Sequence, residues 1–322
     1  MRYGCLIRPK TKDWEHSVPD CLHALGSLAH CSYDPVNVRA FLNILQITTI
    51  IKAMPMNTSA SESIDTVQVK RDGAVFFVTI NRPEVRNAVD SMTAQKLYDA
   101  FLAFENDPNA SVAILTGKGN AFCAGADLKA MASGDREKLR TRGGMGSLAP
   151  MGPSRLSLSK PVIAAIEGPA VAGGMELALW ADLRVVGQGG YFGVYCRRFG
   201  VPLIDLGTIR LPRLIGQSRA MDLILTGRRV DATEAYEIGL ANRIAEKGQS
   251  LDTAVDLAKQ LIAFPQRCMR ADRASLLKQW SVSEEEAIAF ELEGGLEVIA
   301  SGETSHGATA FSHGKGKHGS FE

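Results

Sequence analysis

The sequence predicts an α/β fold, in which helices cover a sheet of mostly buried strands. Two observations support this prediction. Apolar segments typical of buried strands recur at residues 74–80, 111–116 and 161–166, and segments of helical periodicity lie between them. After about residue 250 the periodicity becomes helical, which indicates a helical C-terminal region.

The first predicted elements are a β-hairpin and a helix. Residues 67–80 contain two strand-like segments joined by a polar turn, which is a hairpin pattern. Asp90 or Ser91 is suited to cap a helix over residues 92–105, where apolar side chains recur at helical spacing.

The later elements alternate in the same way. The strand at residues 111–116 ends in a glycine-containing turn, and the strand at residues 161–166 is followed by a helix that begins near Met175. Ser283 and Glu286 form a capping box at the start of the last helix, and we expect the tail after Gly302 to be mobile. The remaining predicted segments are one strand at residues 183–186 and three helices at residues 253–263, 271–280 and 283–301.

The chain divides into three regions. Residues 1–65 lack a clean periodicity and end in a polar run, so we interpret them as an N-terminal extension with a flexible linker. Residues 66–250 form the core, and residues 251–322 form the helical C-terminal region and tail. Met54 and Met56 stand just before the linker and are alternative start positions.

The composition argues against several classes of function. The 36 basic and 35 acidic residues give a net charge of +1, which argues against a nucleic-acid-binding protein. The best candidate for a membrane span, residues 41–51, is too short and is interrupted by polar residues. All six histidines lie within residues 16–30 and 306–318, so the central region holds no Ser-His or Cys-His nucleophile. We therefore expect no metal site, no nucleic-acid partner and no membrane partner.

The cysteines and the N-terminus bear on the compartment. The six cysteines form no CxxC pair, and their irregular spacing is typical of reduced thiols inside a cell. Early acidic residues make the N-terminus a poor transit peptide. We therefore expect a cytoplasmic protein, with a mitochondrial location as the alternative if residues 1–53 are translated and cleaved.

Two glycine-containing turns that follow buried strands are candidates for a binding site. One lies at residues 122–129 and contains Ala-Gly-Ala-Asp, and the other lies at residues 168–177 and contains Ala-Gly-Gly-Met-Glu. Small residues let a ligand approach the backbone closely. A turn that opens a helix points free N–H groups outward, and two such groups aimed at one point form an oxyanion hole. Either turn alone is better explained by tight packing, but the pair, separated by the strand that begins at Lys160, is more specific.

In their order along the chain, these motifs resemble the crotonase superfamily, to which enoyl-CoA hydratases and isomerases belong. The resemblance covers residues 66–300 and implies a crotonase-like spiral of ββα units with a helical C-terminal trimerisation region, assembled as a homotrimer or homohexamer. It also implies acyl-CoA thioester substrates, with coenzyme A as part of the substrate and no cofactor bound permanently. The matching motifs are Asn81-Arg82-Pro83, residues 122–129, residues 160–177, Ala181-Asp182, Leu225-Thr226-Gly227-Arg228 and Gly239-Leu240-Ala241-Asn242.

The resemblance assigns the chemistry to three residues. The N–H groups of Ala124 and Gly173 polarise the thioester carbonyl and stabilise the enolate when it forms. Glu176, at the start of the helix after Gly173, acts as the acid/base residue that moves a proton. The alternative interpretation of Glu176 is a glutamate that only stabilises the positive end of the helix dipole.

The resemblance also indicates where the coenzyme A part of the substrate binds. Arg86 could meet a phosphate, or it could be a solvated surface arginine. The implied contacts come from the position after Asn81-Arg82-Pro83, with Val85 and Arg86, and from the loop of Ala124, Gly125, Ala126 and Asp127.

One position departs from the family pattern. Family hydratases carry a second glutamate further along the chain, and in the ungapped register that position falls on Cys196. A rival register, which needs compensating gaps, places Leu203 there. No glutamate lies between Glu176 and Glu234. Asp205 lies in that interval, and it either replaces the missing acid or caps the turn that follows it.

Two hypotheses of function follow. The first is an enoyl-CoA hydratase, a lyase, or an enoyl-CoA isomerase of fatty acid metabolism, in which Glu176 moves the proton and Asp205 assists. A proton shift can proceed on one carboxylate, whereas water addition is expected to use two, so the choice between the two reactions stays open. The second hypothesis is a non-catalytic acyl-CoA-binding oligomeric protein, which the missing second glutamate favours and Glu176 opposes.

Overall fold

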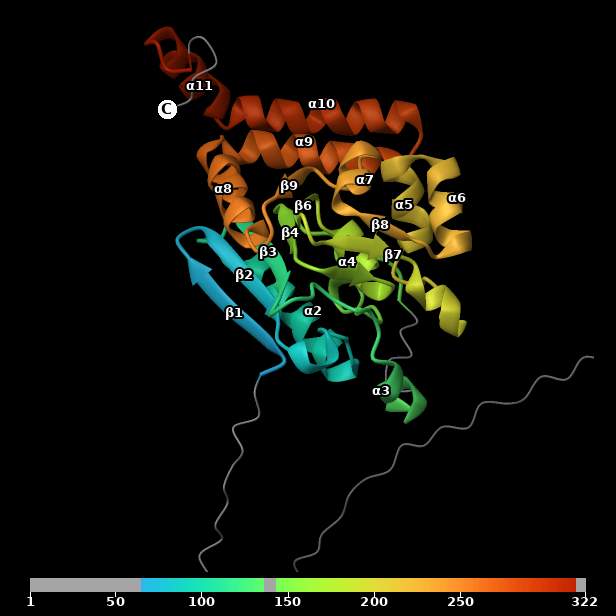
Figure 1. Cartoon of the computed structure of the whole chain (residues 1–322). Helices are drawn as coiled ribbons and strands as arrows, with labels where there is room; N and C mark the ends of the chain where they lie inside the picture. Colours follow the sequence, from blue (N-terminus) through green and yellow to red (C-terminus); the bar gives the residue numbers. More distant parts are fainter. Residues whose placement is uncertain (1–64, 136–142, 317–322) are drawn as a thin grey trace, which may run out of the picture. The chain divides into compact units, whose positions relative to one another are not determined.

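A computed structural model of the chain describes residues 65–135 and 143–316. Figure 1 follows these residues from the hairpin β1–β2 to the last helix, α11. The predicted N-terminal extension lies outside the described residues, apart from Asp65.

A six-stranded sheet in the order β1-β2-β3-β4-β6-β9 forms the centre of the described region. β1 and β2 pair antiparallel, as the hairpin pattern predicted, and all other neighbours pair in parallel. The middle strands are buried almost throughout, because a parallel sheet is covered on both faces. The six strands are β1 (Val67–Asp72), β2 (Val75–Ile80), β3 (Val112–Gly117), β4 (Val162–Ile166), β6 (Leu183–Gly187) and β9 (Arg243–Ala245).

A smaller sheet consists of β5 (Pro169–Val171), β7 (Tyr191–Gly193) and β8 (Arg229–Asp231). β4 enters the large sheet, β5 enters the small one, and the helix α4 (Gly173–Trp180) follows, so these three elements form a ββα unit. β6 and β7 divide between the two sheets in the same way. An isolated parallel bridge from Cys123 to Ala170 continues the pattern after β3. This arrangement confirms the predicted spiral of ββα units.

Helices cover the two faces of the large sheet. α2 (Ser91–Asn106) packs on β1 and β2 through Leu97, Phe101 and Phe104, which are fully buried. α8 (Ser250–Ala263) packs on β3, β4 and β6. The strands supply alternate residues to the two hydrophobic clusters, as strand geometry requires. Asp90, rather than Ser91, caps α2, since its Oδ1 accepts a hydrogen bond from Thr93 N at 2.8 Å.

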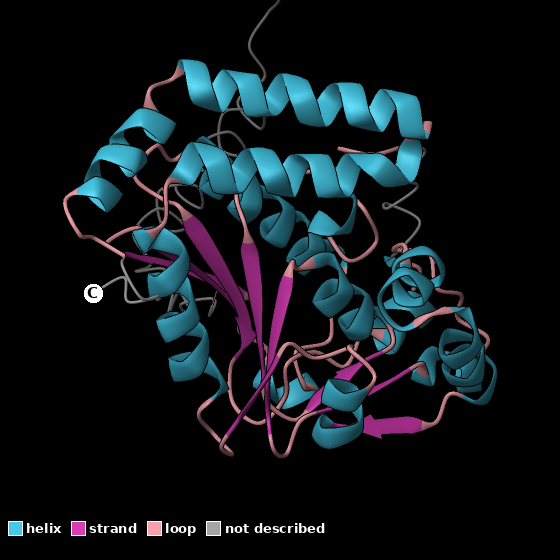
Figure 2. Ribbon diagram, turned by 90° about the horizontal axis from the view of Figure 1, so that it is seen from above, coloured by secondary structure: helices cyan, strands magenta, loops and turns pink. Residues whose placement is uncertain are grey.

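The C-terminal region is helical, as expected. α9 (Gln266–Lys278) and α10 (Glu284–Ala300) lie side by side, which Figures 1 and 2 both show, and the predicted capping box opens α10. Residues after Gly302, which we expected to be a mobile tail, instead form α11 (Glu303–Ser312). The start of α11 is attached to the start of α9, because the Glu303 carboxylate accepts hydrogen bonds from the N–H groups of Arg267 and Cys268.

Large apolar side chains are exposed on α9, α10 and α11 and on the short turn between α9 and α10, namely Leu276, Leu277, Trp280, Ile288, Phe290, Leu292, Leu296, Ile299 and Phe311. Within residues 65–135 and 143–316, no helix has the length and apolar character needed to cross a membrane.

Several short elements complete the described fold, and two of them, η3 and α5, contact α4. The α-helices among them, α3, α5, α6 and α7, were not predicted from the sequence; α5 begins after Leu206, which has the left-handed conformation, and has no side-chain cap. The short elements are η1 (Pro83–Val85), α3 (Leu128–Ala132), η3 (Pro153–Arg155), η4 (Tyr195–Phe199), α5 (Gly207–Ile215), α6 (Gln217–Thr226), α7 (Ala232–Glu237) and η5 (Gln279–Ser281).

Candidate active site

A pocket lies at the N-terminal end of α4, where both glycine-containing turns meet. Its walls come from segments that are far apart in the sequence, which the spiral brings together. Most of the lining is apolar, and the acidic groups in it are Glu176 and Asp205. The lining residues are Ala124, Ala126, Leu128, Met151, Ala172, Gly173, Glu176, Tyr195, Cys196, Phe199, Val201, Pro202, Ile204 and Asp205.

Glu176 is buried in the first turn of α4, with only 3% of its surface exposed. Its Oε1 accepts hydrogen bonds from Asp205 N and Gly207 N, both at 2.9 Å. Burial, followed by the negative charge of Asp205, raises the pKa of Glu176 to about 8, although the two N–H donors and Arg210 act in the opposite direction. Glu176 is therefore mostly protonated at neutral pH and can release its proton a little above it.

Asp205 is also buried, and its side chain is held from another segment. Its Oδ1 accepts hydrogen bonds from Met151 N at 3.0 Å and from the Ser154 hydroxyl at 2.5 Å. The helix α5, which follows this turn, begins without a side-chain cap hydrogen bond. Sequence reasoning missed Ser154, since it lies 51 residues away from Asp205 and no local pattern connects the two.

The loop at residues 122–129 does not present the N–H group that we expected. Ala124 N donates to the carbonyl oxygen of Arg86 at 2.9 Å, so this N–H group is already engaged. Ala126 pairs with Val89 in a parallel bridge, in which Val89 bonds to the two neighbours of Ala126, Gly125 and Asp127. Because successive N–H groups of an extended segment point to opposite edges, the Ala126 N–H lies on the edge away from Val89. The Ala124 N–H is thus bonded within the protein, and Ala126 also lines the pocket.

Gly173 is the first residue of α4 and lines the same pocket. An N–H group at this position has no acceptor within its own helix. The two turns approach so closely that a Cβ on Gly125 would lie 2.9 Å from Gly173 N. Gly173 is also close to a third segment, since a Cβ on it would lie 2.5 Å from the sulfur of Met151. The turn before the helix is strained at Ala172, whose φ of 53° is rare for an L-residue. The geometry brings the Gly173 N–H, Ala126 and Glu176 to one pocket.

Comparison with known proteins identifies the family. Residues 70–318 match the family model described as enoyl-CoA hydratase/isomerase. The chain belongs to this family.

Two curated relatives illustrate the similarity. The chain is 35% identical over 250 residues to enoyl-CoA hydratase EchA19 of Mycobacterium tuberculosis, covering 76% of this chain and 92% of that relative. It is 34% identical over 253 residues to a carnitinyl-CoA dehydratase of Salmonella arizonae, covering 77% of this chain and 95% of that relative.

Solved structures agree with this assignment. An enoyl-CoA hydratase from Mycobacterium tuberculosis H37Rv superimposes with a TM-score of 0.71 at 37% identity, covering 77% of this chain and 96% of that chain. An enoyl-CoA hydratase subunit from Geobacillus kaustophilus gives a TM-score of 0.71 at 32% identity, with 77% and 95% coverage.

The structure supports the ungapped register for the position where family hydratases carry a second glutamate. Cys196 lies in η4, is 7% exposed and lines the pocket, whereas Leu203 is not among the lining residues, although both pack in the same hydrophobic cluster. Burial, and then the nearby charge of Glu176, raise the pKa of the Cys196 thiol. An enoyl-CoA hydratase/isomerase family member thus carries a neutral thiol where a carboxylate was expected.

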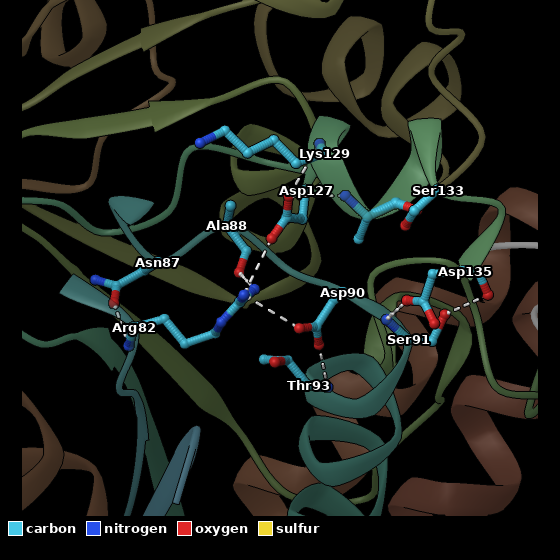
Figure 3. Close-up of polar contacts among 11 residues, drawn as sticks. Arg82, Asn87, Ala88, Asp90, Ser91, Thr93, Asp127, Lys129, Ser133 and Asp135 are labelled. Atoms are coloured by element: carbon cyan, nitrogen blue, oxygen red, sulfur yellow. Dashed lines mark hydrogen bonds and ion pairs between the residues drawn. The ribbon is translucent and has the colours of Figure 1, made fainter. Parts of the chain in front are cut away.

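Of the residues expected at the coenzyme A end, Val85, Arg86, Gly125 and Asp127 do not line the pocket. Val85 is half-buried at the end of η1, and Arg86 is exposed in the left-handed conformation. Asp127 does not offer its carboxylate to solvent, because it caps α3 and pairs with Arg82, as Figure 3 shows. Of the loop residues, Ala124 and Ala126 line the pocket. Within residues 65–135 and 143–316, His, Cys, Asp and Glu side chains form no cluster suited to a metal ion.

Proposed function

We propose that the chain catalyses the addition of water to an enoyl-CoA thioester, or the reverse dehydration, with coenzyme A as part of the substrate and no permanently bound cofactor. The observation that carries this proposal is Glu176, a buried carboxyl group whose pKa is raised to about 8 in a pocket that Ala126 and Gly173 also line. A general acid/base works best when its pKa lies near the working pH. Family membership makes an acyl-CoA thioester the substrate class.

The thioester carbonyl would accept hydrogen bonds from Ala126 N–H and Gly173 N–H. The Gly173 N–H has no acceptor in its own helix, and the Ala126 N–H lies on the loop edge opposite its pairing partner. Such donors stabilise the negative charge that develops on the carbonyl oxygen when the enolate forms. They also withdraw electrons from the conjugated double bond, so that Cβ becomes open to attack by water.

The two carboxyl groups divide the proton transfers. The water oxygen forms a bond to Cβ and its proton passes to Asp205, while the Cα–Cβ π electrons move into the enolate. Glu176, which is protonated at neutral pH, then donates its proton to Cα, and the enolate collapses to the 3-hydroxyacyl thioester. A proton must return from Asp205 to Glu176, directly or through solvent, before the next cycle. Met151 N and Ser154 keep Asp205 in position for this role.

The oligomeric state is a further part of the proposal. The helices α9, α10 and α11 expose eight large apolar side chains, and Trp280 in η5 adds a ninth. A trimer or a dimer of trimers would cover this surface, because exposed apolar patches of this kind mark interaction sites.

Isomerisation of the double bond is the second candidate, and the observation that favours it is Cys196. A neutral thiol at this position leaves Glu176 as the group suited to move the proton, which it removes in its ionised form and returns in its protonated form. A shift of the double bond needs one proton removed and one returned, which a single carboxylate can perform in turn.

The test uses purified protein and two substrates. Loss of conjugated thioester absorbance from crotonyl-CoA, with 3-hydroxybutyryl-CoA identified by mass spectrometry, is expected for a hydratase. A gain of the same absorbance from a 3-enoyl-CoA would identify an isomerase. Binding of both substrates without either change would contradict an enzymatic function and support the non-catalytic acyl-CoA-binding alternative.

A further inference from the structure

The Arg82 side chain makes three contacts beside the pocket. Two are with the segment at residues 88–90, and the third is with Asp127 in the loop at residues 122–129. One guanidinium nitrogen donates to the carbonyl oxygen of Ala88 at 2.6 Å, and the other lies 3.0 Å from Asp127 Oδ2 and 3.2 Å from Asp90 Oδ2. Figure 3 shows this fork, with Arg82 between the two carboxylates. The side chain is only 15% exposed, so water competes poorly for these contacts.

Each carboxylate uses its other oxygen to cap a helix. Asp127 Oδ1 accepts from Lys129 N and Ala130 N at the start of α3, and Asp90 Oδ1 accepts from Thr93 N at the start of α2. Burial opposes ionisation of Asp127, but the helix N–H groups and Arg82 more than compensate and lower its pKa. Asp127 directly follows Ala126 in the chain. Its charged carboxylate therefore attaches this part of the loop to Arg82.

The main chain on both sides of Ala126 is tied to the segment at residues 86–89. Val89 N donates to Gly125 O at 2.8 Å, and Asp127 N donates to Val89 O at 2.9 Å. The carbonyl of Ala88, which Arg82 holds, belongs to this same segment. Arg82 thus contacts both halves of the bridge that determines the direction of the Ala126 N–H, one through Ala88 and the other through Asp127.

We propose that Arg82 is a positioning residue for the oxyanion hole, and that it acts through Asp127 to keep the Ala126 N–H aimed at the thioester carbonyl. This inference rests on the proposed function. Arg82 acts through Asp127 and makes no contact with the substrate itself. Its planar fork can meet the Ala88 carbonyl and two carboxylates at once, whereas a lysine ammonium in its place is a point charge without that geometry.

The experiment compares two substitutions at capping aspartates that share Arg82. Asp127→Asn weakens the pairing on the loop side, and Asp90→Asn weakens it on the α2 side, so the second variant is the matched control. Arg82→Lys removes the fork from both sides. Each change is made in a Glu176→Gln background, in which crotonyl-CoA binds without turnover, and the thioester C=O stretch of the bound ligand is measured by infrared difference spectroscopy. The same three substitutions are also made in the active chain to measure kcat and KM.

In the Glu176→Gln parent, we expect the bound C=O stretch to lie below that of free crotonyl-CoA. Arg82→Lys and Asp127→Asn should return it part of the way toward the free value, and Asp90→Asn should leave it unchanged. Because loss of one oxyanion donor costs about 10²–10³ in kcat, a misdirected donor should cost at least about 10-fold, mainly in kcat rather than KM. Arg228→Lys is a second control, because Arg228 also bridges two carboxylates, Asp222 and Glu234, but on the exposed surface.

Three outcomes would overturn the inference. If Arg82→Lys and Asp127→Asn lower only the melting temperature and leave the C=O stretch and kcat at the level of Arg228→Lys, the role of Arg82 is purely structural. If Asp90→Asn moves the stretch as much as Asp127→Asn does, the effect does not pass through the loop. If the parent itself shows no shift of the bound carbonyl, the oxyanion hole of the proposed function fails, and the role of Arg82 fails with it. Asp127→Asn keeps the inference testable if Arg82→Lys does not fold, since the asparagine oxygen can still cap α3.

Discussion

The main-chain N–H of Asp205 donates a hydrogen bond to Glu176 Oε1 at 2.9 Å, so the two acidic residues of the pocket are joined through the backbone of one and the carboxyl group of the other. The Asp205 side chain is turned to different donors, Met151 N and the Ser154 hydroxyl. One short turn thus orients Glu176 and also brings a second negative charge close to it, which raises the pKa of Glu176.

Gly207→Ala should displace Glu176. A Cβ at this position would lie 2.8 Å from Glu176 Oε1, closer than real Cβ contacts allow, so the carboxyl group must move and weaken its bonds to the turn. We expect kcat to fall at least about 10-fold, because a misplaced catalytic group loses much of its effect. Gly295→Ala in α10 is the matched control, since its Cβ would meet nothing within 4 Å, and it should add up to about 1 kcal/mol of stability. Equal activity of the two variants would contradict the positioning of Glu176 by this turn.

Glu176→Gln should abolish turnover but preserve binding of the acyl-CoA. The amide oxygen can still accept the hydrogen bonds from Asp205 N and Gly207 N, but the side chain can no longer take up or release the catalytic proton. Loss of general acid/base catalysis should lower kcat by about 10²–10⁴-fold. Steady-state kinetics and isothermal titration with crotonyl-CoA measure the two effects separately. Full activity in a well-folded variant would remove Glu176 from the mechanism.

Hydration should fall as the pH rises above about 8, because Glu176 loses the proton that it donates to Cα. The same raised pKa affects stability, because the folded protein holds this proton more tightly than the unfolded chain does. The free energy of unfolding that proton binding contributes is complete below the ordinary carboxyl pKa, and it is lost as the pH rises to about 8. Asp205→Asn removes the neighbouring negative charge and should move both pH transitions to lower pH. Profiles of residual kcat/KM and of melting temperature against pH provide the measurement. If the transitions stay in place in Asp205→Asn but disappear in Glu176→Gln, burial alone raises the pKa.

Cys196→Glu should increase hydratase activity at some cost in stability. Cys196 lines the pocket near Glu176, so a glutamate there could share the proton transfers of water addition. The added carboxylate would be partly buried beside another acid, which raises at least one pKa and destabilises the fold. Crotonyl-CoA hydration and thermal melting measure the two effects, and Cys196→Gln controls for side-chain size. If Cys196→Glu folds and binds substrate without a gain, and Asp205→Asn is silent, Glu176 acts alone and the isomerase becomes the better proposal.

A chain that starts at Met56 should fold and react like the full chain. Every catalytic element of the described region, from β1 onward, lies after this position, and the hydrophobic core begins at Val67. Thermal melting, oligomer size and crotonyl-CoA turnover of the two chains give the comparison. A large loss of stability or solubility in the shortened chain would show that residues before Met56 pack on the core.

The elements that depend on local patterns could be predicted from the sequence. The hairpin β1–β2, the helix α2 and the capping box at Ser283 follow from alternation, apolar spacing and short-range hydrogen bonds, and all of them are present. The two glycine turns and Glu176 line one pocket; each turn is a short motif that can be read from the sequence, and the family resemblance implied that they act together.

Which groups are free to act depends on contacts that form only in the folded chain. Whether Ala124 or Ala126 presents its N–H depends on pairing with residues 86–89, which no periodicity in the loop reveals. The attachment of Asp205 to Ser154 joins segments 51 residues apart. The raised pKa of Glu176 depends first on burial, which exists only once distant strands and helices have packed around it. Local sequence specifies which residues are available, whereas hydrogen-bond partners and local dielectric are properties of the folded chain.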